Sequence, residues 1–209
     1  MFNDYKGYSK SGGTALAYKV DLFDWSTSAN DFGVSTVVSS SAYTGSFVDW
    51  GTNKIGNDAP NTWRTLTKDE WYYLRYNRTN ANDLCGVAQV NGINGLIFLP
   101  DNWTCPEGVT FKSGFHSDES VEAYGQYQTF TAEQWSTLEK SGAVFLPAAG
   151  RRSEEEEVVN VQYRGCYRSA TPTEYSNYLS YHLGFNSSSE GVGVEDRRYG
   201  QSVRLVKDL

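Results

Sequence analysis

The sequence predicts an α+β fold, in which two helices accompany short antiparallel strands and long irregular loops. A chain of 209 residues is long enough to bury one substantial core. Two helix-start motifs can be placed, and the other apolar residues fall in short runs or alternate with polar ones. A content of 15% aromatic and 39% hydrophobic residues argues against disorder.

Both predicted helices begin at a capping box, in which a Thr hydroxyl accepts from the backbone N–H three residues later and that residue's side chain reaches back. The first helix is expected from Thr67 to about Asn77. The second is expected from Thr131 to Gly142, because Gly is a common helix stop. In each helix, a Trp and a Leu provide one apolar face.

Short apolar runs indicate the strands. The runs 95–100 and 142–147 both end in Pro and are rich in branched and aromatic residues, as buried strands are. Residues 87–90 lead into the turn signal Asn91-Gly92. The segments 181–185 and 200–206 alternate, which places His182 and Gly184 on the face opposite their neighbours. Residues 111–129 have no clear period, and we expect an irregular insertion there.

Charge and cysteine content exclude several classes of function. The net charge of -7 argues against a general nucleic-acid binder, because Lys and Arg are not in excess. Apolar runs are too short for a membrane-spanning helix. The three cysteines form no Cys-x-x-Cys pair and the two histidines are far apart, so we expect no metal site and no cofactor. Pairing of Cys85 with Cys105 and two separate thiols are both open.

The composition changes at about Gly150. All six Trp residues precede it, whereas residues 151–209 contain six Tyr and a nearly balanced eight basic and nine acidic side chains. A gain of Tyr, Ser, Gly and Arg is typical of binding loops. An ordinary solvated surface is the plain alternative for scattered exposed aromatics.

An ordered set of segments resembles a known family, namely residues 63–71, 99–103, 142–152, 165–172, 181–185 and 197–206, with a further match at 21–25. Together they resemble the variable proteins of diversity-generating retroelements, in the branch common in Bacteroides-type bacteria and their phages. The resemblance implies a C-type-lectin-like domain at 51–209, distantly related to formylglycine-generating enzymes, with a variable region at 151–200. Residues 1–50 are then the N-terminal part of this domain or a lead-in.

In that family, error-prone reverse transcription of a template repeat replaces codons at the end of the gene. The resemblance therefore implies a non-enzymatic ligand-binding protein: a surface or pilus-tip adhesin, or a phage receptor-binding protein. We expect an extracellular or cell-surface location, with the N-terminal targeting segment missing from this chain. We also expect a monomer that binds an unknown protein or glycan, without nucleic acid or cofactor.

Matching to the family assigns the ligand-binding side chains position by position. Tyr167 matches a fixed position between replaceable ones, and exposed side chains should be replaceable at small cost in stability. The Glu154–Glu157 run departs from the family pattern, which expects a loop rich in Gly, Thr and Ser. Val159, Tyr163 and Glu195 are further variable positions. The implied ligand-binding residues are Arg151, Ser153, Asn160, Gln162, Arg164, Cys166, Arg168, Tyr175, Tyr178, His182, Gly184, Ser188, Glu190, Arg198 and Tyr199.

Two other functions are open at this stage. The first is a carbohydrate-binding module without diversification, although the calcium-lectin triplets Glu-Pro-Asn and Gln-Pro-Asp are absent from the sequence. The second is an enzyme like the formylglycine-generating relatives, which use paired cysteines. Cys85, Cys105 and Cys166 lack the close spacing which that chemistry needs.

Overall fold

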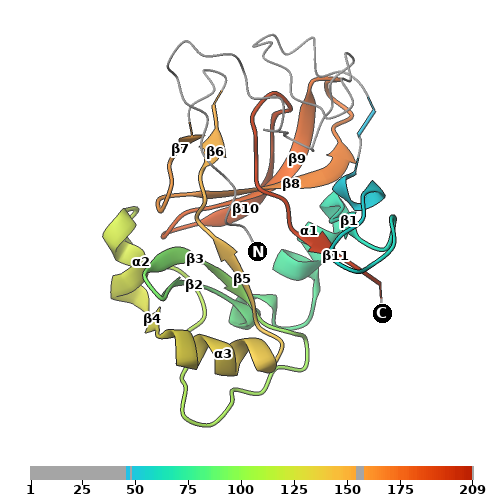
Figure 1. Cartoon of the computed structure of the whole chain (residues 1–209). Coiled ribbons are helices and arrows are strands. Elements are labelled where there is room, and N and C mark those ends of the chain that lie inside the picture. The colour runs from blue at the N-terminus through green and yellow to red at the C-terminus, as the bar shows by residue number, and fades with distance from the viewer. Residues whose placement is uncertain (1–45, 48, 154–157, 209) are drawn as a thin grey trace, which may run out of the picture.

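A computed structural model describes residues 46–47, 49–153 and 158–208, and its fold is of the mixed α+β class (Figure 1). Most of the segment 1–50, the match at 21–25 and the Glu154–Glu157 run lie outside the described residues. The helices are α1 (Lys68–Tyr72), α2 (Val121–Tyr127) and α3 (Ala132–Lys140), with shorter turns η2 (Trp50–Thr52), η3 (Tyr73–Asn77) and η4 (Ala81–Leu84). None of the helices in this part of the chain is both long and apolar enough to cross a membrane.

Both predicted capping boxes are confirmed. Thr67 and Glu70 open α1, which continues through the π-helical turn η3 to Asn77. Thr131 and Gln134 open α3 in the same way. Gly142, just beyond α3, has a φ of 93°, a backbone conformation that favours glycine at helix ends.

The prediction of an irregular insertion at 111–129 is wrong in part, because α2 lies within it. The side chain of Ser120 caps this helix by accepting from the backbone N–H of Ala123. Of the seven residues of α2, only Ala123 and Tyr124 are buried. So short a helix with two buried positions shows no clear apolar period in the sequence.

The first sheet has four strands in the order β4-β2-β3-β5. Strands β2 (Cys85–Val90) and β3 (Ile93–Phe98) form the predicted hairpin. Asn91 and Gly92 both have positive φ, 48° and 80°, as the tightest hairpin turns require. The predicted apolar runs form β3 and β5 (Val144–Pro147), while β4 (Thr129–Phe130) pairs parallel to β2.

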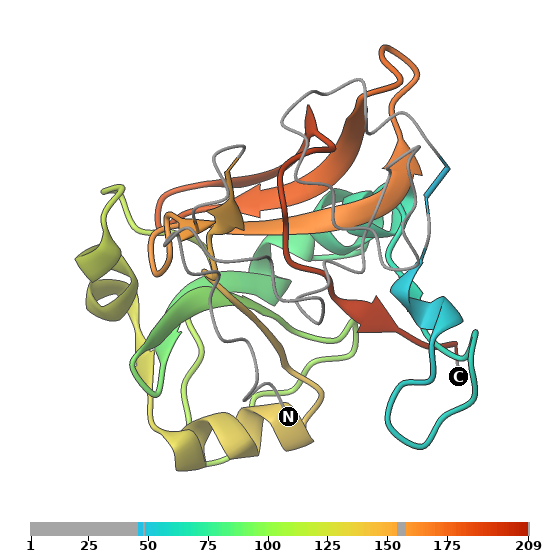
Figure 2. The ribbon, with the colours of Figure 1, turned by 45° about the horizontal axis from the view of Figure 1, so that its top comes forward.

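The second sheet has three strands in the order β10-β9-β8 and lies above the first in Figure 2. Its strands are β8 (Gly165–Pro172), β9 (Leu179–Phe185) and β10 (Glu190–Asp196). Tyr167, Leu183 and Phe185 belong to one apolar cluster with Trp71 of α1 and Leu96 of β3. The main core therefore lies between the two sheets.

A second apolar cluster lies under α3. Along β3, Leu96 and Phe98 belong to the core between the sheets, whereas Ile97 belongs to the cluster that contains Leu138 of α3. Successive side chains of a strand point to opposite faces, so the first sheet is covered on both sides. This burial makes the β2–β3 hairpin the centre of the scaffold.

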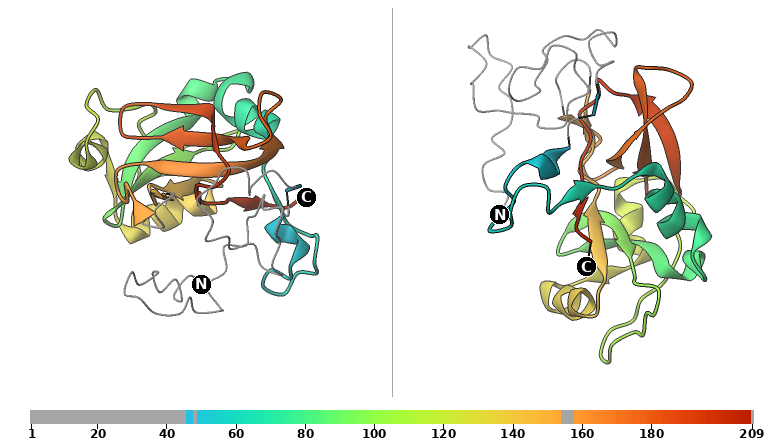
Figure 3. Two further views of the ribbon diagram at one scale, coloured as in Figure 1. Left: turned by 90° about the horizontal axis from the view of Figure 1, so that it is seen from above. Right: turned by 90° about the vertical axis from the view of Figure 1, so that its right-hand side faces the viewer.

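The last segment of the chain crosses the second sheet and returns to the scaffold (Figure 3). Arg152 pairs with Gly200, and Tyr167 pairs with Ser202, as isolated bridges. The predicted strand 200–206 is confirmed only as β11 (Leu205–Val206), which pairs with β1 (Arg64–Thr65). A second short ladder joins β6 (Arg151–Arg152) to β7 (Val158–Val159).

All three cysteines are free thiols. Cys85 and Cys166 are buried, and Cys105 is exposed. The pairing of Cys85 with Cys105 that the sequence left open is therefore not formed.

Candidate ligand-binding face

The second sheet has one face toward the core and an opposite face, which we call the outer face. Directly paired residues of antiparallel strands point to the same side. Cys166, Gly184 and Gly191 are paired across the three strands, and so are Arg168, His182 and Gly193. Because Tyr167 and Leu183 point into the core, these six residues belong to the outer face, as do Ser180 and Glu195.

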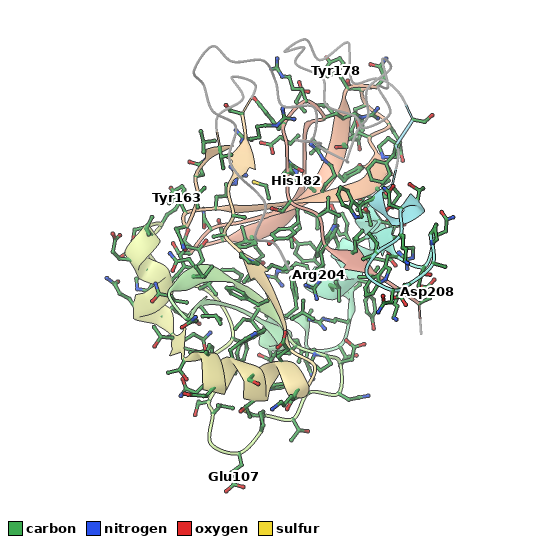
Figure 4. All side chains as sticks on the ribbon, viewed as in Figure 1. Glu107, Tyr163, Tyr178, His182, Arg204 and Asp208 are labelled. Carbon is green, nitrogen blue, oxygen red and sulfur yellow. The ribbon has the colours of Figure 1, made fainter. Side chains whose placement is uncertain are left out.

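His182, labelled in Figure 4, lies close enough to three arginines for their charges to act on it. Burial, together with the positive charges of Arg168, Arg164 and Arg151, lowers the pKa of His182 to about 3. The imidazole is therefore neutral at pH 7. Its Nδ1 is buried and has no hydrogen-bond partner among the described residues.

Arg168 fastens the outer face to the segment that follows β10. Its guanidinium donates to the Ser180 hydroxyl on β9 and to the backbone carbonyls of Tyr199 and, at 3.4 Å, Asp196. Only 3% of Arg168 is exposed. The side chain thus supports the fold, whereas the family resemblance implies a variable ligand-binding position there.

Glu195 connects three residues at the edge of the outer face. Its carboxylate pairs with Arg151 and accepts from Nε2 of Gln201. The Arg151 guanidinium also lies over the Tyr199 ring, 4.2 Å from its centroid. Arg151 Nε and Gln201 Oε1 are nevertheless buried without a hydrogen-bond partner in the described part of the chain. Buried polar atoms without partners are rare in folded proteins, so this cluster holds unused hydrogen-bonding capacity.

Tyr178 lies apart from His182 in Figure 4, and both Tyr175 and Tyr178 belong to the turn between β8 and β9. They line an open pocket of about 870 Å³. Tyr175 is 80% exposed and Tyr178 is 44% exposed. Arg197 fixes the wall by donating from Nε to the backbone carbonyl of Leu179. The other lining residues are Ser46, Phe47, Ala170, Pro172, Thr173, Glu174, Ser176 and Asn177.

Two of the sequence-predicted site residues form contacts with the scaffold instead. Gln162 accepts from the backbone N–H of Asn94 through Oε1. Glu190 pairs with Arg75 of η3, and only 5% of the Glu190 side chain is exposed. The family resemblance implies that both positions are variable, whereas in the structure both side chains satisfy buried or half-buried partners.

The remaining predicted residues are scattered around the second sheet. Asn160 is exposed in the turn before β8, with a φ of 61°. Ser153 follows β6 and is half-buried. Ser188 donates to Asn186 in the turn between β9 and β10, and Arg198 pairs with Asp196 at 3.3 Å. Arg198 also lies over the Tyr199 ring, 5.6 Å from its centroid.

The outer face is more buried than the sequence indicated. Cys166 has no exposed surface and His182 has 5%. Gly184 is also buried. Burial raises the pKa of the Cys166 thiol. All three positions are therefore buried, and the predicted separation of His182 and Gly184 from Leu183 and Phe185 is confirmed.

Sequence reasoning left Gln201 and the glycines of β10 out of the site. The alternation in β10 could have indicated them, because Gly191, Gly193 and Glu195 share a face and Val192 packs toward the core.

Comparisons of the chain with protein-family models, curated protein sequences and solved structures found no match.

Proposed function

We propose that this chain is a non-enzymatic ligand-binding protein of the diversity-generating retroelement type, with a C-type-lectin-like fold. The observation that carries the proposal is the division of β8 and β9 into two faces. Tyr167, Leu183 and Phe185 pack in the core, whereas the family-matched positions Cys166 and His182 point the other way. Such a division keeps the side chains that pack in the core apart from those at the family-matched positions.

The pocket at the β8–β9 turn supports the same proposal. Its exposed Tyr175 and Tyr178 offer large contact areas that lose little side-chain entropy on binding. Tyr is enriched at the energetically important positions of interfaces. The pocket also includes Glu174 and Asn177, which add charge and hydrogen bonding beside the aromatic rings.

The contacts narrow the set of positions that we propose to be diversified. Gln162, Arg168 and Glu190 make hydrogen bonds or ion pairs that hold the scaffold together. We therefore assign the freely variable role first to Asn160, Tyr175 and Tyr178, which are exposed.

The proposed partner is a protein or a glycan outside the cell, bound by a monomer on a cell or phage surface. A non-enzymatic role is supported by the thiols, because reactive cysteines need a lowered pKa. Burial instead raises the pKa of Cys85 to about 12 and also raises that of Cys166.

Sequencing of the DNA around the gene tests this proposal. We expect a reverse-transcriptase gene and a near-copy of the coding segment for residues 151–209. Mismatches between the two copies should fall only at adenines of the copy and should include the codons for Tyr175 and Tyr178. The codons for Tyr167, Leu183 and Phe185 are the internal control and should be identical. Absence of both elements would contradict the proposal.

A further inference from the structure

We propose that the open edge of β10, the side of this strand that faces away from β9, binds an extended segment of a protein ligand. The bound segment would extend the second sheet by one strand. This inference rests on the proposed ligand-binding function and names a polypeptide, rather than a glycan, as the partner. Three features support it: the edge has no cover among the described residues, two residues direct their backbone groups outward, and the strand lacks the usual protection of an edge.

The two edges of the second sheet differ in their cover. On the β8 side, Arg168 donates its backbone N–H to the carbonyl of Ser202, and Ser202 donates to the carbonyl of Cys166. On the other side, β10 is the last strand of the sheet. Outside the ladder with β9, Val192 and Val194 make no backbone hydrogen bond with any described residue. One edge is therefore closed by the last segment of the chain, and the other is open.

Hydrogen bonds at the two ends of the β9–β10 ladder show which backbone groups face the open edge. Asn186 donates its N–H to Ser189 at one end, and Arg197 donates to Tyr178 at the other. Between these ends the register is continuous, and bonded pairs alternate with non-bonded pairs in an antiparallel ladder. Both end pairs join an even-numbered residue on the β9 side to an odd-numbered one on the β10 side. The odd-numbered residues of β10 are therefore the ones that bond to β9.

Val192 and Val194, the even-numbered residues in the middle of β10, thus direct both N–H and C=O away from β9. The two donors and two acceptors alternate along the edge with the repeat of a β-strand. The row ends at Asp196, whose carbonyl already accepts from the backbone N–H of Tyr199. An extended polypeptide has the matching alternation of donors and acceptors, and a glycan does not. Recognition by strand addition uses this match of backbones.

The strand β10 also lacks the features that usually protect an exposed edge. Such edges are commonly very short, carry Lys or Pro, or contain a β-bulge. The seven residues Glu190–Asp196 include neither Lys nor Pro, and they pair with β9 without a shift in register. Val194 is 43% exposed at this edge. An edge of this length without protection is suited to binding another strand.

Tyr76 marks one end of the proposed site. A methyl group added to Gly191 would lie 3.4 Å from the Tyr76 hydroxyl, so this side chain of η3 reaches the start of β10. Tyr76 is 46% exposed, and its ring centroid lies 5.5 Å from that of Tyr72. Exposed aromatic rings beside the edge provide contact area for side chains of the bound strand, and such contacts give strand addition its specificity.

A strand from another protein fits this edge better than a second copy of the chain does. The strand β10 contains the carboxylates of Glu190, Glu195 and Asp196 and no basic residue. Antiparallel pairing of two copies about Gly193 would place Glu190 opposite Asp196, and like charges directly opposite each other are destabilising. The net charge of -7 also opposes self-association. We therefore expect a partner strand with basic residues near its ends and an apolar residue opposite Val194.

Amide hydrogen exchange measured by NMR tests whether the edge is open in the unbound chain. The N–H groups of Gly193 and Glu195 bond to β9 and should be protected from exchange. Those of Val192 and Val194 should exchange at least about tenfold faster. Equal protection of the two sets would mean that the edge is covered, and it would overturn the proposal.

A displayed library of random heptapeptides, selected on the immobilised wild-type chain, provides the probe for binding. We expect enriched peptides that bind saturably and slow the exchange of the Val192 and Val194 amides at least about tenfold. Methylation of alternate backbone nitrogens in an enriched peptide removes its donors and should abolish this protection. Failure to enrich any peptide, or enriched peptides that leave the two amides unchanged, overturns the proposal. The measurement needs no variant of the protein.

A proline variant locates the site on β10. Val194→Pro removes an N–H that points away from β9, and Pro is tolerated at such positions of edge strands. Binding of the enriched peptides should weaken at least about tenfold, because a carbonyl of the peptide loses its donor. Ala132→Pro is the matched control, since Ala132 is exposed at the first position of α3, where Pro is favoured. This control should bind as the wild type does.

Two results with the proline variant contradict the proposal. The first is unchanged peptide binding by folded Val194→Pro protein. The second is a wild-type dimer in analytical ultracentrifugation that Val194→Pro converts to a monomer, which would assign the edge to a second copy of the chain.

The outcome is separable from that of the proposed function. If the retroelement elements are found and no peptide binds at β10, the ligand-binding role stands and only the strand-addition site fails. If peptides bind at β10 and the elements are absent, the site stands and diversification fails.

Discussion

Gln162 and Asn94 hold each other through two hydrogen bonds that cross from the C-terminal segment to the central hairpin. Oε1 of Gln162 accepts from the backbone N–H of Asn94 at 2.7 Å, and Nδ2 of Asn94 donates to the backbone carbonyl of Gln162 at 2.9 Å. Asn94 is 1% exposed, so water cannot replace these bonds. The turn that leads into β8 is thereby fixed to β3.

Replacing Gln162 should therefore destabilise the fold, although the family resemblance makes it a variable position. Gln162→Ala leaves the buried N–H of Asn94 without an acceptor, which should cost about 1–3 kcal/mol of unfolding free energy. Urea unfolding followed by circular dichroism measures this cost. Gln126→Ala, at an exposed position of α2, is the control and should change stability by less than about 0.5 kcal/mol. Equal effects of the two substitutions would show that Gln162 is not a structural residue.

The ion pair between Arg75 and Glu190 leads to a second prediction about stability. Both side chains are largely buried, at 14% and 5% exposure. Removing one charge leaves the other buried and unpaired, which typically costs about 3–5 kcal/mol. We expect a loss of this size for Glu190→Gln or Arg75→Met alone, and a double variant less destabilised than the sum of the two.

A double-mutant cycle in urea measures this coupling. Asp208→Asn is the control, because Asp208 pairs with Arg64 while 83% of its side chain is exposed. Exposed ion pairs contribute about 0–1 kcal/mol, so this variant should be nearly neutral. Additive effects of the two changes at the buried pair would refute a direct coupling.

Local sequence signals predicted most of the scaffold. The capping boxes, the Asn91-Gly92 turn and the alternation in β9 each depend on residues within one turn or strand, so they can be identified without tertiary contacts. The helix α2 was missed because only two of its seven residues are buried.

The candidate site was predicted less well, because its burial depends on distant segments. The alternation placed His182 and Gly184 on the face opposite Leu183, which the strand register confirms. Their low exposure is not encoded within β8 and β9. Residues such as Arg151 and Tyr199 meet at this face from segments almost 50 positions apart in the chain. No local pattern in the sequence indicates that contact.

The buried imidazole of His182 should make stability depend on pH. Its pKa is about 3 in the folded protein, against an ordinary value of 6.5. Between these values the unfolded chain binds a proton that the folded protein does not. Stability is therefore greatest above pH 6.5 and is lost as the pH falls, by up to about 1.4 kcal/mol per pH unit from this group.

Unfolding free energies measured from pH 7.5 to 5 test this dependence. His182→Gln should remove this part of the slope, whatever its effect on stability at pH 7.5. His116 is half-buried near the surface, and its Nδ1 accepts from the backbone N–H of Asp118. His116→Gln should keep the slope of the wild type. A wild-type slope in the His182→Gln protein would mean that other groups cause the loss in acid.

Tolerance to substitution should differ between the pocket and the outer face. Tyr175 is 80% exposed, so replacing it by Ser, Asp or Arg should change the free energy of unfolding by less than about 0.5 kcal/mol. At Arg168, the matching set of Ser, Asp and Lys should cost more, and several times more for Ser and Asp. Arg168→Ser and Arg168→Asp remove the guanidinium from the buried Ser180 hydroxyl and the Tyr199 carbonyl, and Asp adds a buried carboxylate. Arg168→Lys keeps the charge without the fork of donors, so its cost in unfolding free energy should lie between these extremes.

Thermal and urea unfolding of this panel compares the two positions directly. If Arg168 accepts all three residues as readily as Tyr175 does, then the outer face is as replaceable as the family resemblance implies, and the structural role of Arg168 is wrong.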